Sequence, residues 1–373
     1  MAVNMIMSIL LYLLIATGTV YLAVKAEQNR QVGKRFLTRT YLHAIFAILF
    51  LCSALRFNVG NDYRQYTQTA HEAYVGGYVV TEAGFNWLVR FVYGLCGGEW
   101  YEVVFAVFAF VTLLLFLKAM YEQSVDFAFS YFLFMTLGLY FQTYNTVRYY
   151  LVLAIALYAM RYVLQRDWIK FIFWILVASL FHKSVLFIIP VYWIASYVWK
   201  KWFIITCVII SALCFLCKKY VLKLALFLYP SYENTVFLEG GTSYVTIVRC
   251  IAVLALYLWY RRYCVQKNLA GEREKELRIY AQLNCVALIF CVFFSFLPVI
   301  TRIVYYFSVN QLLMLPVLVK SIPDEKLQKR IKYGIISCCI VYFGVFLLTA
   351  GQTGVKLIPY QSWLFEAERF QYK

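Results

Sequence analysis

Long apolar stretches alternate with short polar connections along almost the whole chain. In windows of ~20 residues, the length of helix that crosses a bilayer, this pattern predicts twelve membrane spans, the second and sixth of them short. The predicted spans lie near residues 6–24, 40–55, 100–117, 127–141, 147–164, 168–181, 184–199, 202–217, 244–260, 279–297, 303–319 and 333–349. The sequence therefore predicts an all-α, polytopic integral membrane protein with a single transmembrane domain over residues 1–373.

The connection over residues 56–99 is long enough to hold structure of its own. Apolar residues recur at helical spacing between Phe85 and Leu95, while polar residues share the opposite face. This pattern is typical of a short amphipathic helix that lies in the membrane interface, and the glycine pair that begins at Gly97 would end it. We therefore expect an outer loop with an interfacial helix here, and a second outer loop over 218–243.

The composition agrees with a membrane protein. Hydrophobic residues make up 64% of the chain and charged residues 14%, and the mean hydropathy is +0.71, which excludes a water-soluble globular fold. The net charge of +17 would suggest a nucleic-acid partner for a soluble protein. In a membrane protein, however, Lys and Arg collect in the cytoplasmic connections. We therefore expect no nucleic acid among the partners.

The positions of Lys and Arg predict an orientation. Alternate connections hold 22 of the 35 basic residues, and these connections are 25–39, 118–126, 161–170, 200–201, 261–278 and 320–332. The positive-inside rule places them in the cytoplasm, and an even number of spans then places both termini outside. Because no basic region precedes the first apolar run, we expect residues 1–24 to be a retained span and not a signal peptide.

Several common functional motifs are missing from the sequence. It has no Gly-rich nucleotide loop, no nucleophile elbow and no paired His or Asp set with metal-ligand spacing. Cys214 with Cys217, and Cys338 with Cys339, have the spacing of metal pairs, but the hydrocarbon layer is an unfavourable place for thiolate ligands. The missing phosphate-binding loop argues against a nucleotide-driven pump. Most of the eleven cysteines fall in or beside apolar runs and are interpreted as small core residues. We expect neither a metal nor another cofactor.

Charged, amide and phenol side chains are most closely spaced between Arg56 and Tyr66, directly after an apolar segment. Arg56 and Arg64 bracket Asp62. Because Gly60 can take a backbone conformation with positive φ, the turn can gather these three charged heads. The stretch therefore predicts an anion site with a base inside it. The alternative is a solvated loop in which Arg56 is an interfacial anchor and Asp62 pairs weakly with Arg64.

Three further arginines lie at or near the outer ends of predicted spans. Arg148 shares a helical face with Asn145, three residues before it. Arg302 opens a span, with Tyr305 one turn on. Arg249 lies about five residues, or ~8 Å, inside its span, where a charge in lipid costs roughly 2.5–3.5 kcal/mol. We expect Arg249 to face the bundle or a wet cavity, whereas snorkelling to the headgroups is the alternative for Arg148 and Arg302.

Two more outer residues can move a proton. His182 has a side chain whose ordinary pKa suits proton transfer near neutrality, although a lone histidine is as often a packing residue. Glu82 precedes the predicted interfacial helix. It either acts beside the stretch from Arg56 to Tyr66, which we call the organising loop, or only provides the negative charge that a helix N-terminus favours.

Five short motifs, spread in order over most of the chain, resemble those of the EpsG family of exopolysaccharide biosynthesis proteins, which is related to the Wzy-type polymerases of O-antigen and capsule. The motifs are Arg56 with Val59-Gly60-Asn61-Asp62-Tyr63 and Tyr66, then Glu82-Ala83-Gly84-Phe85, Asn145 with Arg148, Leu180-Phe181-His182-Lys183-Ser184, and Ile358-Pro359-Tyr360. The chain departs from the family pattern at Tyr149, where many relatives have a glutamine after the arginine.

The resemblance implies polymerisation of lipid-linked repeat units on the outer face of the bacterial inner membrane. It also implies a C-type, all-helical glycosyltransferase architecture that uses no nucleotide sugar. The donor would be a glycan on undecaprenyl pyrophosphate, and the acceptor another lipid-linked repeat. Arginines would hold the pyrophosphate by bidentate hydrogen bonds, so a divalent metal would be dispensable. Membrane lipids, a chain-length regulator and a flippase are the other expected partners.

On this hypothesis the organising loop supplies the catalytic base. Asp62 is the expected base, and Glu82 and His182 are the alternative catalytic residues. The arginines expected to hold the pyrophosphate together are Arg148, Arg249 and Arg302. The other residues expected to bind substrate are Arg56, Tyr63, Arg64, Tyr66, Asn145 and Tyr305.

Two other functions are compatible with the same residues. In a transporter of glycans or lipids, the outer arginines would line a substrate path without chemistry. A membrane O-acyltransferase would use His182 as its base. The unusual polar residues cluster on one predicted side of the membrane, whereas a transporter needs substrate cavities open to both sides. This asymmetry favours the enzyme that joins lipid-linked repeats.

Overall fold

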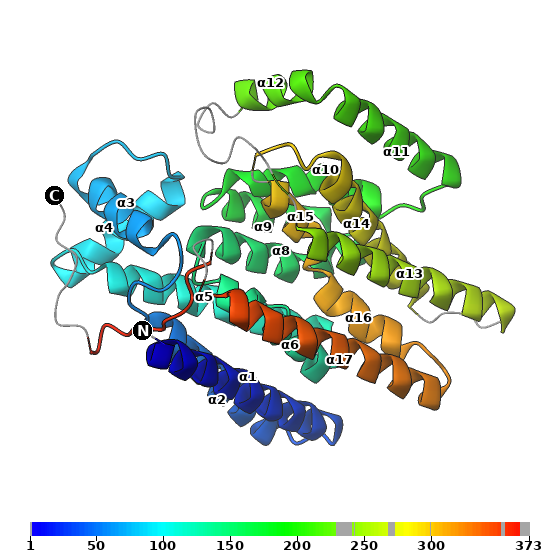
Figure 1. Ribbon diagram of the computed structural model, residues 1–373, viewed down its shortest axis with the longest axis horizontal. Helices are drawn as coiled ribbons and strands as arrows, with labels where there is room; N and C mark the ends of the chain where they lie inside the picture. The colour runs from blue at the N-terminus through cyan, green and yellow to red at the C-terminus, as the bar shows by residue number, and fades with distance from the viewer. Residues whose placement is uncertain are drawn as a thin grey trace. The chain divides into compact units, whose positions relative to one another are not determined.

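The computed structural model describes residues 2–228, 241, 243–267, 273–298, 300–351 and 355–365, and over these ranges the regular elements are helices (Figure 1). The chain packs as two compact units. The first contains Met1–Tyr158, Val177–Lys183 and Asp324–Lys373, and the second contains Ala159–Leu176 and Ser184–Pro323. All-α architecture is therefore confirmed for the described part of the chain.

The helices of the first unit are α1 (Ala2–Gln31), α2 (Arg35–Ala54), α3 (Tyr63–Val75), α4 (Ala83–Cys96), α5 (Tyr101–Gln123), α6 (Phe127–Thr136), α7 (Leu139–Gln142), the start of α8 (Val147–Gln165) and α17 (Glu325–Thr349). The second unit holds the end of α8, most of α9 (Trp168–Ser179), the 3-10 helix η1 (Lys183–Phe187), α10 (Ile188–Ala195), α11 (Lys201–Leu216), α12 (Lys218–Leu228), α13 (Tyr244–Gln266), α14 (Glu274–Phe293), α15 (Ile300–Ser308) and α16 (Gln311–Lys320).

Among the described residues, eight helices are long and apolar enough to cross a membrane. They are α1, α2, α5, α8, α13, α14, α15 together with α16, and α17. The pair α11 and α12, bent by 87°, makes nine if it counts as one span. The chain is thus a multi-pass membrane protein, but the prediction of twelve spans is wrong.

The surplus spans come from apolar segments that form short helices. The segments predicted near 127–141, 168–181 and 184–199 contain α6, α9 and α10, of 10, 12 and 8 residues. A helix of 10 residues is about 15 Å long, half of the hydrocarbon thickness. Helix α6 stops before Gly138, which has a φ of +75°. Apolar helices of this length are typical of a buried core, and most of α6 is buried.

The first unit has two distinguishable ends. At one, Tyr360 joins the start of α1 to the end of α2. Its backbone N–H donates to the Ser8 hydroxyl and its side-chain hydroxyl donates to the Cys52 carbonyl, both at 2.9 Å. We call this the loop end. At the other, Lys332 pairs with Asp126 at 2.6 Å, beside the end of α1. This basic end carries Lys25, Arg30, Lys34, Arg35, Lys326, Lys329, Arg330 and Lys332.

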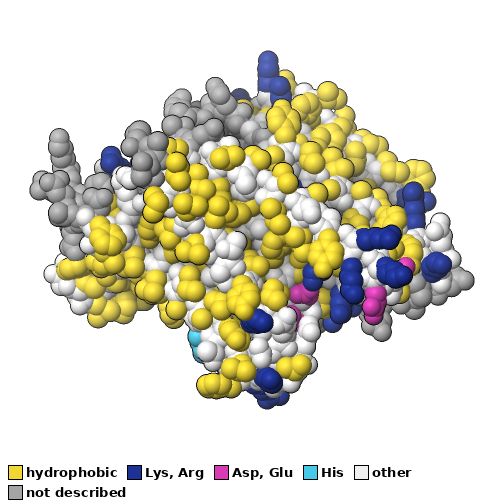
Figure 2. Space-filling view, turned by 60° about the horizontal axis from the view of Figure 1, so that its bottom comes forward, with side chains coloured by type: hydrophobic (Ala, Val, Ile, Leu, Met, Phe, Trp, Pro, Cys, Tyr) yellow, Lys and Arg dark blue, Asp and Glu magenta, His cyan; other side chains and the backbone are white. Residues whose placement is uncertain are grey.

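The surface is dominated by apolar side chains. On the face in Figure 2, hydrophobic side chains are spread over much of the area. Many large apolar residues on the spanning helices are exposed, for example Leu14 at 69% and Leu348 at 75%. Such exposure is unfavourable in water and expected for residues that face lipid.

The segment predicted as an outer loop over 56–99 contains the helices α3 and α4. Helix α4 ends at Gly97, whose φ of +67° suits the left-handed C-cap position that glycine fills most readily. Its inner face buries Phe85 and Val89, while Trp87 and Leu95 are exposed by 64% and 72%. The helix expected from the sequence is thus present, and its interfacial position stays a prediction.

The second unit has a polar core between α13, α14 and α16. The Asn284 amide donates to the Cys250 carbonyl at 2.9 Å, and the Gln311 amide donates to the Asn284 side chain at 2.7 Å. These bonds tie three apolar helices together. Of the second predicted outer loop, 218–243, the first part forms α12, and residues 229–240 and 242 lie outside the described residues.

Candidate functional site

The organising loop is paired along its length with the C-terminal segment, by which we mean residues 355–365. The Phe57 backbone N–H donates to the Gln361 carbonyl at 2.8 Å, and the Gly60 N–H donates to the Lys356 carbonyl at 2.9 Å. Arg56 and Ser362 form an antiparallel bridge between the two segments. The loop is therefore held by main-chain bonds from the far end of the sequence.

Gly60 allows this loop to approach the segment before α8. It has a φ of +103°, and a Cβ atom built on it would lie 2.3 Å from the Tyr144 carbonyl oxygen. Only glycine fits both conditions. One residue on, the Asn61 backbone N–H donates to the Asn145 side chain at 2.8 Å. Asn145, expected to bind substrate, thus joins the first and third sequence motifs.

Arg56 lies beneath the loop, whereas Arg64 is exposed. The Arg56 side chain is 2% exposed, and its guanidinium carbon lies 5.0 Å from the centre of the Phe105 ring and 5.2 Å from that of Tyr144. Burial lowers the pKa of Arg56, and the nearby tyrosines, Tyr63 first among them, act in the opposite direction. The charged groups of Arg56, Asp62 and Arg64 are therefore not all exposed together, because the Arg56 guanidinium is buried.

Asp62 and Tyr63 have different environments although they are neighbours. Asp62 is half-buried at the N-cap position of α3, and its side chain does not cap that helix. Tyr63 is 1% exposed, stacks on Phe105 with ring centres 4.7 Å apart, and donates a long hydrogen bond of 3.4 Å to the Arg56 carbonyl. Burial raises the pKa of Tyr63. The buried phenol supports the loop, and the carboxyl group lies nearer the surface.

Glu82 and Arg148 form a mostly buried ion pair. One Glu82 carboxylate oxygen accepts a hydrogen bond from the Arg148 guanidinium, and the other accepts the Lys183 backbone N–H at 3.1 Å. The Arg148 guanidinium also lies over the Tyr66 and Phe85 rings, 5.6 and 5.4 Å from their centres. The pair is only 15–17% exposed at its side chains. Glu82 therefore fixes Arg148 against two aromatic rings.

His182 belongs to the first unit and lies in the turn after α9. The Gly84 backbone N–H donates to the Leu180 carbonyl at 2.8 Å, and a Cβ on Gly84 would lie 2.6 Å from that oxygen. The His182 ring packs edge-on against Tyr149, with centres 5.8 Å apart. All five sequence motifs thus meet in the first unit, apart from the final Ser184.

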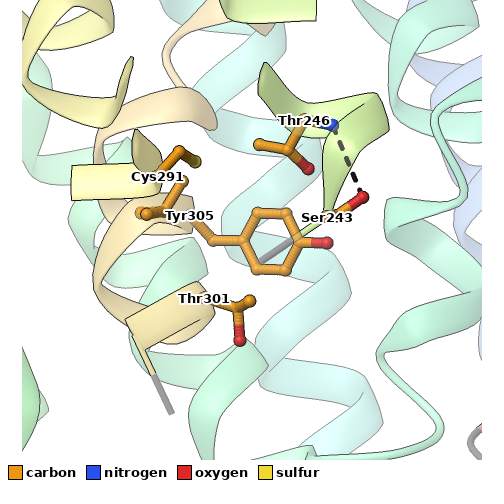
Figure 3. A pocket seen from close by; sticks show the side chains of 6 residues that line it. Ser243, Thr246, Cys291, Thr301 and Tyr305 are labelled. Carbon is orange, nitrogen blue, oxygen red and sulfur yellow. Dashed lines mark hydrogen bonds between the residues drawn. The ribbon is translucent and has the colours of Figure 1, made fainter. Parts of the chain in front are cut away.

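Arg249, Arg302 and Tyr305 belong to the second unit. Arg249, on α13, is half-buried, and its Nε atom has no hydrogen-bond partner among the described residues. Tyr305, on α15, lines a small pocket in which its ring lies among hydroxyl groups (Figure 3). The other residues that line the pocket are Ser243, Thr246, Cys291, Thr301 and Val304. Because Arg148 lies in the first unit, a shared clamp of three arginines stays a prediction.

Two residues of the loop end were missed in the sequence. The Asn58 side-chain oxygen accepts a hydrogen bond from Arg64 Nε at 3.2 Å and from Lys356 Nζ at 3.3 Å. Nothing in the local sequence singles out either residue. The available signal was the motif at Ile358, two residues after Lys356, which marks the C-terminal segment.

Within the described ranges, no three His, Cys, Asp or Glu side chains gather as ligands of a metal ion. In a comparison with known protein families, the model described as the EpsG family matches residues 39–362. That range contains every site residue named above. No match was found among curated proteins or among solved structures.

Proposed function

Because this chain belongs to the EpsG family, which is linked to exopolysaccharide biosynthesis, we propose that it is a polysaccharide polymerase. It would join oligosaccharide repeat units linked to undecaprenyl pyrophosphate, in exopolysaccharide, capsule or O-antigen synthesis. The reaction would be a metal-independent glycosyl transfer. The acceptor hydroxyl would attack the anomeric carbon of the donor, its proton would pass to a base, and the lipid pyrophosphate would leave.

The observation that carries this proposal is the meeting of Asp62 and the Glu82–Arg148 pair in one unit, at one end of it. Glycosyl transfer from a pyrophosphate needs a base for the acceptor and a fixed cation for the leaving group. Asp62 is the proposed base. Arg148, oriented by Glu82, would bind pyrophosphate oxygens, while Arg56 and Tyr63 would support the loop from below.

The charge distribution of the first unit supports an extracytoplasmic reaction. Its basic end carries Lys and Arg from the α1–α2 connection and from the start of α17. By the positive-inside rule that end faces the cytoplasm, so the loop end with Asp62 faces outward. The start of α1 and the end of α17 share the loop end, and both termini would lie outside a bacterial inner membrane. This is the side where lipid-linked repeats would be joined.

The α3–α4 hairpin fits the interface of such a membrane. Trp87 and Phe91, which are stacked with ring centres 5.2 Å apart, are exposed on α4 together with Leu95. Tryptophan is enriched at the headgroup level of bilayers. An interfacial α4 would hold Glu82, at its N-terminus, near the depth at which the pyrophosphate of a lipid carrier lies. Such an arrangement would fit the C-type glycosyltransferase architecture that the resemblance implies.

One observation favours a transporter as the second candidate. Helices α11 and α12 are bent by 87° at a break near Cys217. Discontinuous spans of this kind line the substrate paths of many transporters. Against a transporter, the Glu82–Arg148 pair and the organising loop lie at the same end of their unit. The O-acyltransferase alternative depends on His182, which packs against Tyr149.

The test is reconstitution of the purified protein in liposomes with the lipid-linked repeat from the producing strain. A polymerase extends the repeat into a ladder of longer lipid-linked glycans, without added metal or nucleotide. A transporter moves the repeat across the bilayer and leaves its length unchanged, and an acyltransferase changes its mass by an acyl group only. Unextended repeats in liposomes that contain folded protein would contradict the proposal.

A further inference from the structure

Helix α11 has the length and the flanking charges of a membrane span. It contains 16 residues, so it is about 24 Å long. Lys200 and Lys201 lie at its start, and Lys218 follows its end. The long stems of lysines let their charges reach the headgroups, so an apolar helix slightly shorter than the ~30 Å hydrocarbon layer can still cross it. Ser211 alone in α11 is buried, as expected of a helix with lipid on most sides.

Helix α12 turns away from α11 at the end of this span. The two helices are bent by 87° at the break near Cys217. A helix at nearly a right angle to a span runs along the plane of the membrane. With 11 residues α12 is about 16 Å long, too short to cross the hydrocarbon layer by itself. If α11 is a span, α12 therefore begins at the headgroup level and stays there.

The exposed face of α12 combines lysines with large apolar side chains. Lys219, Lys223 and Phe227 follow one another at intervals of four residues and form one stripe along the helix. Tyr220 and Leu224 lie beside that stripe. Tyr220 is 78% exposed and Phe227 is 80% exposed. A short helix with exposed basic, aromatic and aliphatic side chains is typical of the membrane interface, where the apolar groups meet acyl chains and the lysines meet headgroups.

The lysines of α12 are not neutralised by the described part of the protein. Residues 168–232 contain neither Asp nor Glu. None of the ion pairs among the described residues involves Lys218, Lys219 or Lys223. The Lys218 ammonium lies 6.0 Å from the centre of the Phe215 ring, a contact that leaves its charge in place. Three positive charges close together at the headgroup level favour a partner with negative charge.

We propose that α12 is an interfacial helix that binds the headgroups of anionic phospholipids through Lys218, Lys219 and Lys223. Its exposed aromatic and aliphatic side chains enter the boundary between headgroups and acyl chains. The inference does not depend on the proposed polymerase function. It also gives the bend between α11 and α12 a role other than lining a substrate path, because α12 lies on the membrane and not within it.

Amide hydrogen exchange in α12 tests this contact. The full-length protein is placed in nanodiscs of phosphatidylcholine, with or without phosphatidylglycerol, and exchange is followed by mass spectrometry. A helix bound to headgroups opens more slowly, because opening must first break its contacts with the lipid. One lysine near an anionic surface strengthens binding about fivefold. Phosphatidylglycerol should therefore slow exchange in α12 by at least about fivefold, and added salt should reverse the effect by screening.

Two lysine substitutions assign the effect to α12. A double variant with Lys219→Gln and Lys223→Gln should lose most of the slowing by phosphatidylglycerol. Lys118→Gln is the matched control, since Lys118 is an exposed lysine that pairs with Glu122 in α5, and this variant should keep the whole effect. Peptides from the buried helix α16 provide an internal reference, whose exchange should not depend on the charge of the lipid. The salt dependence of the wild type tests the proposal even if the double variant does not fold.

Three results would overturn the proposal. Slow exchange that is the same in both lipids and insensitive to salt means that α12 is enclosed as the second half of a broken span. Fast exchange in both lipids means that α12 is a solvated arm without a lipid partner. Equal slowing by phosphatidylglycerol in the wild type and in the folded double variant means that the lipid acts elsewhere on the protein. Slowing that depends on salt and on the lysines of α12 supports the interfacial helix.

Discussion

Glu82 and Arg148 are in direct contact although 66 residues separate them in the sequence. Glu82 lies at the N-cap of α4, and Arg148 lies in the first turn of α8. The second oxygen of Glu82 holds the Lys183 backbone N–H, so one carboxylate ties together three of the five sequence motifs. On the proposed function, Glu82 would orient the Arg148 guanidinium, and another group would take the proton of the acceptor.

The Glu82→Gln variant tests that task. Glutamine can keep the bond to the Lys183 N–H, but it leaves the mostly buried Arg148 charge without its carboxylate. We expect stability to fall by about 1–3 kcal/mol and chain extension to fall by roughly 10- to 100-fold. Thermal unfolding and the extension assay measure the two effects.

A double-mutant cycle provides the control for Glu82. When Glu82→Gln is combined with Arg148→Gln, the uncompensated charge is gone, so the two losses should not add. Fully additive losses of stability would mean that the two side chains do not depend on each other.

Gly60→Ala should damage the fold of the loop end. The new Cβ would lie 2.3 Å from the Tyr144 carbonyl oxygen, at a φ of +103° that alanine avoids. We expect a loss of at least about 1–3 kcal/mol in the free energy of unfolding, together with loss of extension. Gly344→Ala is the matched control, since nothing lies within 4 Å of the new Cβ in α17. That change should be neutral, or stabilise by up to about 1 kcal/mol. Equal melting temperatures for the two variants would contradict the geometry.

Lysine substitutions test the predicted arginine clamp. Arg148→Lys, Arg249→Lys and Arg302→Lys keep the charge but lose the planar fork that binds two phosphate oxygens. Each should lower extension by roughly 10- to 100-fold at normal expression. Arg35→Lys, on the basic end of the first unit, should leave the rate unchanged because this side chain is exposed. A clamp shared by the two units is refuted if only Arg148→Lys loses activity.

The number of membrane spans could not be predicted from hydropathy alone. Hydropathy located every apolar segment, including those that became α6, α9 and α10, but it does not register a helix break such as that at Gly138. A segment that is apolar because it is buried in protein has the same composition as one that faces lipid. For α6, most of which is buried, the overcount follows from this ambiguity, whereas α9 and α10 were counted because hydropathy does not show that their helices are short.

The part of the candidate site in which charged and amide residues follow one another closely in the sequence could be predicted. The loop from Arg56 to Tyr66 stood out because charge, amide and glycine follow one another, and Gly60 does take a positive φ. The position of Arg56 beneath the loop could not be predicted, because its burial depends on rings from α5 and from the segment before α8. The contact of Asn58 with Lys356 spans 298 residues, and no local pattern encodes it.

The choice of base is tested at Asp62. This residue is half-buried in a loop fixed by main-chain bonds on one side and by Asn145 on the other. Asp62→Asn keeps the size and hydrogen-bonding capacity of the side chain but removes its ability to accept a proton. We expect the variant to bind the lipid-linked repeat normally and to lose chain extension by more than about 100-fold, the lower range of general base effects.

The pH profile separates Asp62 from His182. A histidine base loses activity as pH falls through the neutral range, because the imidazole becomes protonated, whereas a carboxylate base stays ionised there. We therefore expect wild-type extension to be nearly constant between about pH 6 and 8. His182→Gln should weaken extension several-fold without changing the shape of this profile, as expected of a residue that packs against Tyr149. If the wild-type rate instead falls below neutrality and the fall disappears in His182→Gln, the base is His182. The loop from Arg56 to Tyr66 would then bind substrate without taking its proton.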